Sequence, residues 1–315
     1  MSAVIDALNR YSADWTALVV AVVWQTTLLA LAIGAIAYAL RTSSPAVRYW
    51  LWQIVAIKLL LMPFWIWWVP LPWSFAPVKN VVALPADVMD QPVPEGIQSP
   101  NRGVANVSAS GSRLSDMRWQ SWLLVAWGAV VLAQFARLAV QWRRLARLLR
   151  AAVPAGEDLC AKVAQVAAKL QLARVPTARL TSVDCSPFVC WALRPTLVLP
   201  RDLLATLAPA ELAQVLAHEL AHVKRRDLVW GWTVELARVF YFFHPVAHWV
   251  GYRVRLEREL ACDQLAMAAS GRGPAEYADT LVRVVSAISQ PSIFRVSVSA
   301  GLDGGESLAR GESKS

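Results

Sequence analysis

Charged residues are absent from long parts of this chain. Residues 15–40 and 119–136 contain none, and residues 49–78 contain only Lys58. Each stretch is long enough to cross the hydrocarbon core of a bilayer as a helix, for which about 20 residues suffice. Hydrophobic residues make up 57% of the chain and mean hydropathy is +0.41, which is high for a soluble protein. We therefore expect a polytopic membrane protein with transmembrane helices at about 15–40, 49–73 and 119–141.

The alternative to membrane spans is a set of core helices buried in a large soluble protein. Tryptophans gather near the ends of the three stretches, as expected for rings at headgroup level. The first stretch is a poor signal peptide, because Asp6 and Asp14 precede it beside only Arg10 and its apolar run is too long. We expect it to be retained in the membrane.

The distribution of basic residues predicts the orientation of the spans. The chain has 31 Lys and Arg against 22 Asp and Glu, and arginines cluster from residue 137 to residue 150. Positive-inside reasoning places the amino terminus and an extracytoplasmic loop at 79–116 outside, and everything after about residue 143 at the cytoplasmic face of a plasma membrane. Direct nucleic-acid binding is the other interpretation of the arginines, but no aromatic-interleaved motif accompanies them. We expect membrane lipid, and no nucleic acid, as a partner.

Cysteine is rare, and its placing argues against disulfides. All four cysteines follow the third span and none forms a CxxC pair. On the predicted topology they face a reducing compartment. Cys185 and Cys190 are most simply small buried residues.

The chain after residue 150 has the pattern of a small α+β domain. Residues 157–172 have helical spacing, and TARLTSV (177–183) and TLVLP (196–200) have the composition of short strands. The next stretch, APAELAQVLAHELAHVKRRD, reads as a helix with Pro209 in its first turn. The polar stretch 291–315, rich in Gly and Ser, is expected to be a disordered tail.

Histidine is as scarce as cysteine, so the placing of the four histidines is informative. His218 and His222 stand four apart in LAHELAHVKRRD and share one face of a helix, where both imidazoles can reach one metal ion. Glu219 between them can take a proton from water. This is the HExxH pattern of zinc proteases. The alternative is a surface helix with solvated histidines.

Zinc in a catalytic site needs a third protein ligand and an open position for water. The downstream stretch RLERELACDQLA offers Glu257, Glu259 and Asp263. By spacing alone all three are candidate ligands, and a carboxylate that does not bind the metal can support a ligand from outside.

Three motifs in order, HELAHVKRRD, FHPVAHW and ERELACD, resemble the cytoplasmic zinc-protease domain of the BlaR/MecR family of membrane metallopeptidases, the β-lactam-sensing antirepressors and their relatives. The resemblance covers the three spans and the domain to about residue 270. More broadly, HExxH followed by ExxxD is similar to the gluzincin pattern. It implies a zincin-like peptidase domain over 151–290 with one Zn²⁺ held by His218, His222 and Glu259. It also implies Glu219 as general base and Asp263 as the support of Glu259.

The resemblance implies a membrane-bound zinc endopeptidase of the antirepressor type. Its substrate would be the protein itself, a cytoplasmic transcriptional repressor or another membrane-associated polypeptide. The strand at 196–200 would pair edge-on with an extended substrate segment. The family's sensors continue into a further span and a penicillin-binding domain, which are not found after residue 290 here. We therefore expect a separate sensor partner rather than direct β-lactam sensing.

Two other functions remain open. One is a quality-control membrane protease similar to the prenyl-protease and heat-shock metallopeptidases, against which FHP and ACD argue. The other is a non-proteolytic signalling scaffold in which zinc is only structural.

Residues 228–250 are apolar enough to cross the membrane except for Glu235 and Arg238. A full crossing would put Glu259 on the face opposite His218. We therefore expect either a hairpin broken at His244 and Pro245, or a helix that lies in or partly enters the membrane. His244 is then a structural residue before a kinking proline, or alternatively a donor to the oxyanion of the reaction.

Overall fold

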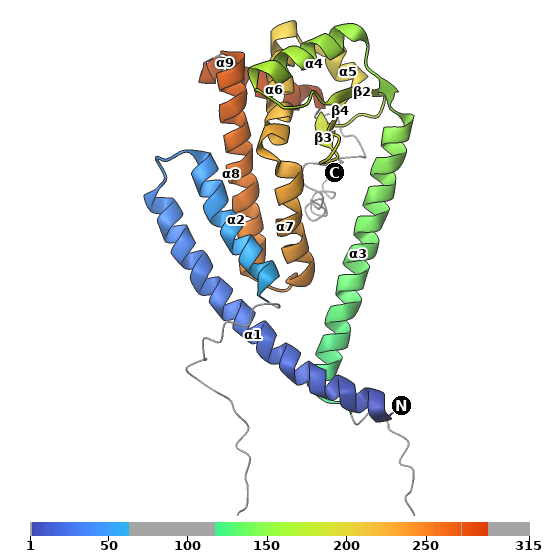
Figure 1. Ribbon diagram of the computed structural model, residues 1–315, viewed down its shortest axis with the longest axis vertical. Helices are drawn as coiled ribbons and strands as arrows, with labels where there is room; N and C mark the ends of the chain where they lie inside the picture. The colour runs from blue at the N-terminus through green and yellow to red at the C-terminus, as the bar shows by residue number, and fades with distance from the viewer. Residues whose placement is uncertain (1, 63–116, 272, 289–315) are drawn as a thin grey trace, which may run out of the picture. The chain divides into compact units, whose positions relative to one another are not determined.

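The computed structural model describes residues 2–62, 117–271 and 273–288 (Figure 1). The predicted loop at 79–116, the predicted tail at 291–315 and the last part of the predicted second span, 63–73, lie outside the described residues. What is described is mainly helical, with one small mixed sheet, as the sequence predicted. The chain divides into two compact units, Met1–Ala21 with Ile66–Ala126, and Val22–Trp65 with Trp127–Ser315.

Two of the described helices are long and apolar enough to cross a membrane. They lie within α1 (Ser2–Ala39) and α3 (Trp119–Ala151), and both overlap predicted spans. The second predicted span begins as α2 (Pro45–Leu61), which has 17 residues in the described part of the chain. The rest of this span falls on residues 63–73, so its crossing of the membrane stays a prediction.

In the first unit, the start of α1 and the start of α3 are joined by polar contacts. Asn9 Oδ1 accepts hydrogen bonds from the Ser121 hydroxyl at 2.7 Å and from the Arg118 backbone N–H at 3.0 Å. The hydroxyls of Ser12 and Ser121 lie 3.0 Å apart, and both are buried. Short hydroxyl and amide side chains hold helices in this way where the surroundings are apolar.

The second unit contains a four-stranded sheet in the order β1-β2-β4-β3. The strands are β1 (Val153–Pro154), β2 (Thr177–Thr181), β3 (Phe188–Cys190) and β4 (Thr196–Pro200). β4 runs parallel to β2 and antiparallel to β3. The expectation that strand 196–200 offers an edge to substrate is therefore wrong. The intervening segment folds back as β3, and its hydrogen bonds occupy that side of β4.

Two helices cover one face of the sheet and form the core with it. They are α4 (Glu157–Lys169) and α6 (Pro209–Arg225), which confirm the helices predicted at 157–172 and after residue 208. Their buried side chains include Val163, Leu216 and Leu220. Pro209 begins α6, and the Glu211 carboxylate accepts a hydrogen bond from the Ala208 N–H at 2.9 Å, which satisfies one unpaired donor of the first turn. α5 (Arg201–Thr206) leads from β4 into α6, and α9 (Pro274–Ile288) follows the last long helix.

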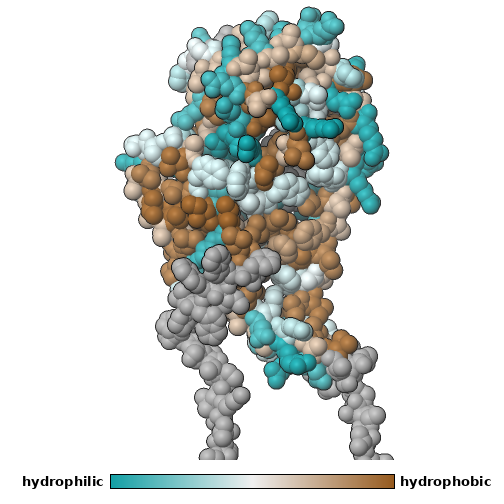
Figure 2. Space-filling model, viewed as in Figure 1, coloured by the Kyte–Doolittle hydropathy of each residue, from teal (hydrophilic) through white to brown (hydrophobic). Residues whose placement is uncertain are grey.

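A helical hairpin follows α6 and packs against α2. α7 (Asp227–Phe240) and α8 (Pro245–Ser270) meet at a short turn, and Pro245 starts α8 where its missing N–H costs nothing. Of the two arrangements expected for residues 228–250, the structure therefore shows the hairpin. α2 packs along both helices through a buried cluster that includes Trp52, Val234 and Val250. On the face shown in Figure 2, hydrophobic surface covers the region of α2 and α7, whereas hydrophilic surface gathers over α4.

Candidate metal centre

Two imidazoles and one carboxylate converge where α6 packs against α8. The Nε2 atoms of His218 and His222 lie 3.5 and 3.7 Å from Oε2 of Glu259. The three ligand atoms all lie within 4.8 Å of one another. The histidines occupy successive turns of α6, so both rings lie on one face of the helix, with their centroids 5.2 Å apart. One small cation can contact all three groups.

These separations fit a zinc ion. Zn–N and Zn–O bonds of about 2.0–2.2 Å place ligand atoms about 3.4 Å apart in a tetrahedron. The observed 3.5 and 3.7 Å are close to that value. Three protein ligands leave one position open, which is the arrangement of catalytic rather than structural zinc sites. The donor set of two imidazoles and one carboxylate therefore suits a catalytic metal.

Asp263 and Tyr277 hold the ring of His218. Its Nδ1 lies 2.9 Å from Oδ1 of Asp263 and 3.2 Å from the Tyr277 hydroxyl, and that hydroxyl donates to the same carboxylate oxygen at 2.7 Å. A carboxylate on Nδ1 fixes the tautomer that leaves Nε2 free to bind metal. Asp263 therefore orients His218, whereas the resemblance implied that it supports Glu259.

His222 has a support of its own that the sequence analysis did not find. Its Nδ1 lies 3.0 Å from Oδ2 of Asp227, which is 4% exposed, and the Arg225 Nε donates to the same oxygen at 3.3 Å. The Cys262 thiol is also buried here, with Sγ 3.3 Å from His222 Nδ1 and 3.4 Å from Asp227 Oδ2. Burial, with the nearby charge of Asp227 adding to it, raises the pKa of Cys262 far above its ordinary value. Cys262 therefore acts here as a neutral thiol.

Arg258 orients the carboxylate of Glu259. Its Nε and Nη2 donate to Oε1 of Glu259 at 3.1 and 2.9 Å, so the other oxygen, Oε2, faces the two histidines. Burial acts to raise the pKa of Glu259, but the hydrogen bond to His218 and the charges of His222 and Arg258 outweigh it and lower the pKa to about 2. The carboxylate is therefore ionised throughout the physiological range, as a metal ligand must be.

The charges around His218 favour a cation at this point. Burial alone would lower its pKa, but hydrogen bonds to Asp263 and Glu259 and the nearby charge of Glu219 raise it to about 10. A group of anions that holds a proton so firmly on an imidazole also attracts a divalent cation to the same place.

Glu219 lies partly buried beside the two histidines and has the properties of a base. Burial raises its pKa above the ordinary value for a carboxyl group, and the charges of His218 and His222 act against this rise. A carboxylate with a raised pKa accepts a proton more readily at neutral pH than an exposed one does.

The structure distinguishes the remaining candidates. Glu257 points away from the metal centre, because its Oε2 accepts a hydrogen bond from Arg48 Nε at 2.8 Å and its side chain is 2% exposed. His244 caps the start of α8, 15 residues before Glu259, which is about 22 Å along a helix. The oxyanion role therefore has no geometric support. The structural role remains for this buried residue.

The groups that the sequence analysis missed are Asp227, Arg258, Tyr277 and Cys262. Asp227 is the last residue of LAHELAHVKRRD, but the motif does not show that it contacts His222. Its role depends on Arg226, whose left-handed backbone (φ 59°) ends α6 and turns the chain so that Asp227 comes back to His222. A non-glycine residue in this conformation is uncommon and has no sequence signal of its own.

We expect Asp227→Asn to weaken zinc binding about 10- to 100-fold, the range for outer residues that orient a metal ligand. The amide loses the charge that fixes the His222 tautomer while keeping its volume. Competition with a zinc-binding dye measures the affinity. Asp202→Asn on α5 removes a carboxylate away from the centre and is the control. Unchanged affinity in the Asp227 variant would contradict the assigned role.

A family model described as BlaR1 peptidase M56 matches residues 17–303, a range that contains every residue of the metal centre. The regulatory protein BlaR1 of Bacillus licheniformis is 32% identical over 78 residues. That stretch is 25% of this chain and 13% of the relative, so the match spans about an eighth of the relative's length.

Proposed function

Because the chain belongs to the BlaR1 peptidase M56 family, we propose that it is a zinc-dependent membrane endopeptidase of the antirepressor type. The observation that carries the proposal is the convergence of His218, His222 and Glu259, each held by a partner of its own. Such an arrangement of three ligands with an open position suits hydrolysis better than a purely structural metal.

In this proposal His218, His222 and Glu259 hold the zinc. When bound, zinc supplies Lewis acidity that lowers the pKa of water and polarises a peptide carbonyl. Glu219 accepts a proton from the attacking water and passes it to the amine of the leaving fragment. Asp263, Asp227 and Arg258 keep the ligand atoms aimed at one point, so that little reorganisation is needed during the reaction.

The same proposal assigns the domains and the orientation. Residues 1–150 form the membrane domain, residues 151–290 form the peptidase domain, and the amino terminus lies outside the membrane. The packing of the α7–α8 hairpin against α2 supports a peptidase domain that is partly embedded at the cytoplasmic face. The substrate is then the protein itself or a cytoplasmic regulatory protein, and a separate partner supplies the inducing signal.

Removal of zinc is expected to abolish cleavage reversibly. Full-length protein purified in mild detergent should contain about one zinc per chain and show self-cleavage on a gel. A chelator should stop the cleavage, and added zinc, but not magnesium, should restore it. The control is Glu157→Gln on α4, which changes an exposed carboxylate away from the centre. Cleavage that continues in chelated protein with no zinc would rule out the proposed chemistry, and bound zinc without cleavage of any substrate would favour the scaffold.

Mapping new amino termini in cells tests the antirepressor role. Cells that produce the chain are compared with cells that produce Glu219→Gln. A new terminus in a DNA-binding repressor, present only with the wild-type chain, is the expected result. New termini confined to misfolded membrane proteins would favour the quality-control function instead.

A further inference from the structure

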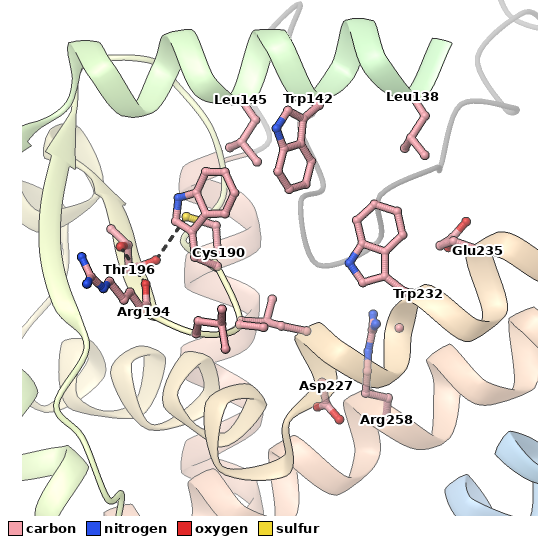
Figure 3. A pocket seen from close by; sticks show the side chains of 15 residues that line it. Leu138, Trp142, Leu145, Cys190, Arg194, Thr196, Asp227, Trp232, Glu235 and Arg258 are labelled. Carbon is pink, nitrogen blue, oxygen red and sulfur yellow. Dashed lines mark hydrogen bonds between the residues drawn. The ribbon is translucent and has the colours of Figure 1, made fainter. Parts of the chain in front are cut away.

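An apolar pocket of about 740 Å³ lies next to the metal centre (Figure 3). Its walls come from α3, from the turn between β3 and β4, and from α7, and they include Leu138, Trp142, Trp191 and Trp232. None of the zinc-ligand candidates is among its lining residues. A volume of this size falls within the range of ligand sites, about 300–1,000 Å³. The pocket therefore needs an explanation separate from the metal centre.

Four charged residues line the pocket, and three of them, Asp227, Glu235 and Arg258, have side-chain partners within the protein, whereas Arg194 is the fourth. Glu235 pairs with Arg238 and Arg255 at 3.7 Å, Asp227 contacts His222, and Arg258 contacts Glu259. Apart from Arg194, these pairs leave little unmatched charge facing the cavity. The part of a ligand that enters the pocket is therefore apolar.

The mouth of the pocket carries exposed apolar side chains. In the turn between β3 and β4, Leu193 is 88% exposed and Trp191 is 39% exposed. Trp191 also has a left-handed backbone, with φ at 64°, which is costly for a bulky residue. Its ring meets that of Trp142 edge to face, with centroids 4.9 Å apart. Trp142 directly follows the predicted third span, 119–141, so its contact with Trp191 brings the turn beside the end of that predicted span.

Two arginines flank the same turn. Arg194 lines the pocket, and Arg226 lines a smaller hollow of about 320 Å³ that shares Ala192, Leu193 and Leu228 with it. Both arginines are exposed. The mouth therefore presents an apolar surface bordered by positive charge.

We propose that this pocket binds one anionic phospholipid, with an acyl chain between Trp142, Trp191 and Trp232 and the phosphate at Arg194 and Arg226. Tryptophan at a span end is typical of the bilayer interface, and basic pockets beside spans on the cytoplasmic side hold anionic headgroups. Guanidinium groups bind phosphate oxygens through charge-assisted hydrogen bonds.

A lipid suits these observations better than a segment of substrate. An extended peptide needs hydrogen-bond partners for its backbone, whereas the pocket walls are mostly aromatic and aliphatic. With residues 119–141 in the membrane as predicted, the pocket lies beside the end of that span, and a lipid would reach it laterally from the bilayer. The proposed lipid site does not require peptidase activity. It requires only that the chain is attached to a membrane.

Photocrosslinking tests the site in full-length protein reconstituted into vesicles. The probes are phosphatidylglycerol and phosphatidylcholine, each with a diazirine on one acyl chain, and mass spectrometry maps the adducts. We expect phosphatidylglycerol to label the peptides containing Trp142, Trp191 and Trp232 about tenfold more than phosphatidylcholine does, because the two arginines repel the positive choline group of phosphatidylcholine.

Two variants, each with a matched control, locate the headgroup and the chain separately. Arg194→Gln should remove most of the preference for phosphatidylglycerol, whereas Arg201→Gln on α5 should not. Gly231→Leu places a side chain in the pocket, where its Cβ would meet Arg258 Nη1 at an ordinary 3.9 Å. This variant should remove the labelling by both lipids. Gly128→Leu, whose Cβ would meet nothing within 4 Å, should leave it unchanged.

Each result counts for or against the lipid site. Labelling that is equal for both lipids and unchanged by Arg194→Gln and Gly231→Leu would show only general contact with the bilayer, and would overturn the proposal. Absence of labelling, together with a Gly231→Leu variant that keeps its zinc but changes the pattern of cleavage products, would assign the pocket to substrate. That result would also overturn the lipid site while leaving the proposed peptidase function intact.

Discussion

Glu219→Gln is expected to slow peptide cleavage by about 10²- to 10⁴-fold, the contribution of a positioned general base. Glutamine keeps the size of the side chain but cannot accept the proton from water. His218, His222 and Glu259 are untouched, as are their supports Asp263, Asp227 and Arg258. The variant should therefore keep its zinc, and the loss should appear in the rate of catalysis rather than in substrate affinity.

The measurement combines zinc content with the rate of self-cleavage in the same detergent-purified samples. Glu157→Gln makes the identical chemical change on an exposed turn of α4 and should cleave at the wild-type rate. Loss of zinc from the Glu219 variant would mean that the carboxylate holds the metal centre together. Cleavage at near the wild-type rate would require another base.

How much of this site the sequence predicts depends on the range of the interactions. His218, Glu219 and His222 lie within two turns of one helix, so helical periodicity alone places them. Asp227 could not be assigned in this way, because its contact with His222 depends on the left-handed turn at Arg226. A local pattern fixes a face of a helix, but it does not show how the next helix returns to it.

The sheet shows the same limit. Strands were predicted at 177–183 and 196–200 from their strand-forming composition, and the structure places β2 and β4 there and pairs them in parallel. β3 has only three residues, all buried, and so shows no alternation of polar and apolar side chains. Overlooking it led to the wrong expectation that β4 has a free edge.

The choice between Glu257 and Glu259 was open from spacing because it depends on how α8 rotates against its neighbours. Two residues apart on a helix, the side chains point in directions about 200° apart. α6 packs on one side of α8 and α2 packs on another. Glu259 accordingly reaches the histidines of α6, whereas Glu257 reaches Arg48 of α2 at 2.8 Å.

Because the two carboxylates face different helices, we expect Glu259→Ala to lose zinc affinity and Glu257→Ala to lose fold stability. Because Glu259 is the proposed third ligand, removing it should lower zinc affinity by more than about 100-fold, beyond the usual range for an outer residue. Removing Glu257 leaves Arg48 without its ion-pair partner, and should destabilise the fold by about 3 kcal/mol, the lower end for a broken buried pair. The lower end applies because Arg48 is 12% exposed and retains some solvent.

Zinc content and thermal unfolding, measured on both variants at a temperature where each is folded, separate the two roles. The Glu257 variant should unfold at a lower temperature yet bind zinc as the wild type does, because the carboxylate that it lacks faces α2 in the wild type. The Glu259 variant should lose zinc, and its unfolding without added zinc should match that of the zinc-free wild type. Zinc lost from folded Glu257→Ala and kept by Glu259→Ala would reverse the assignment. In that case the orientation of α8 between α2 and α6 would itself be wrong.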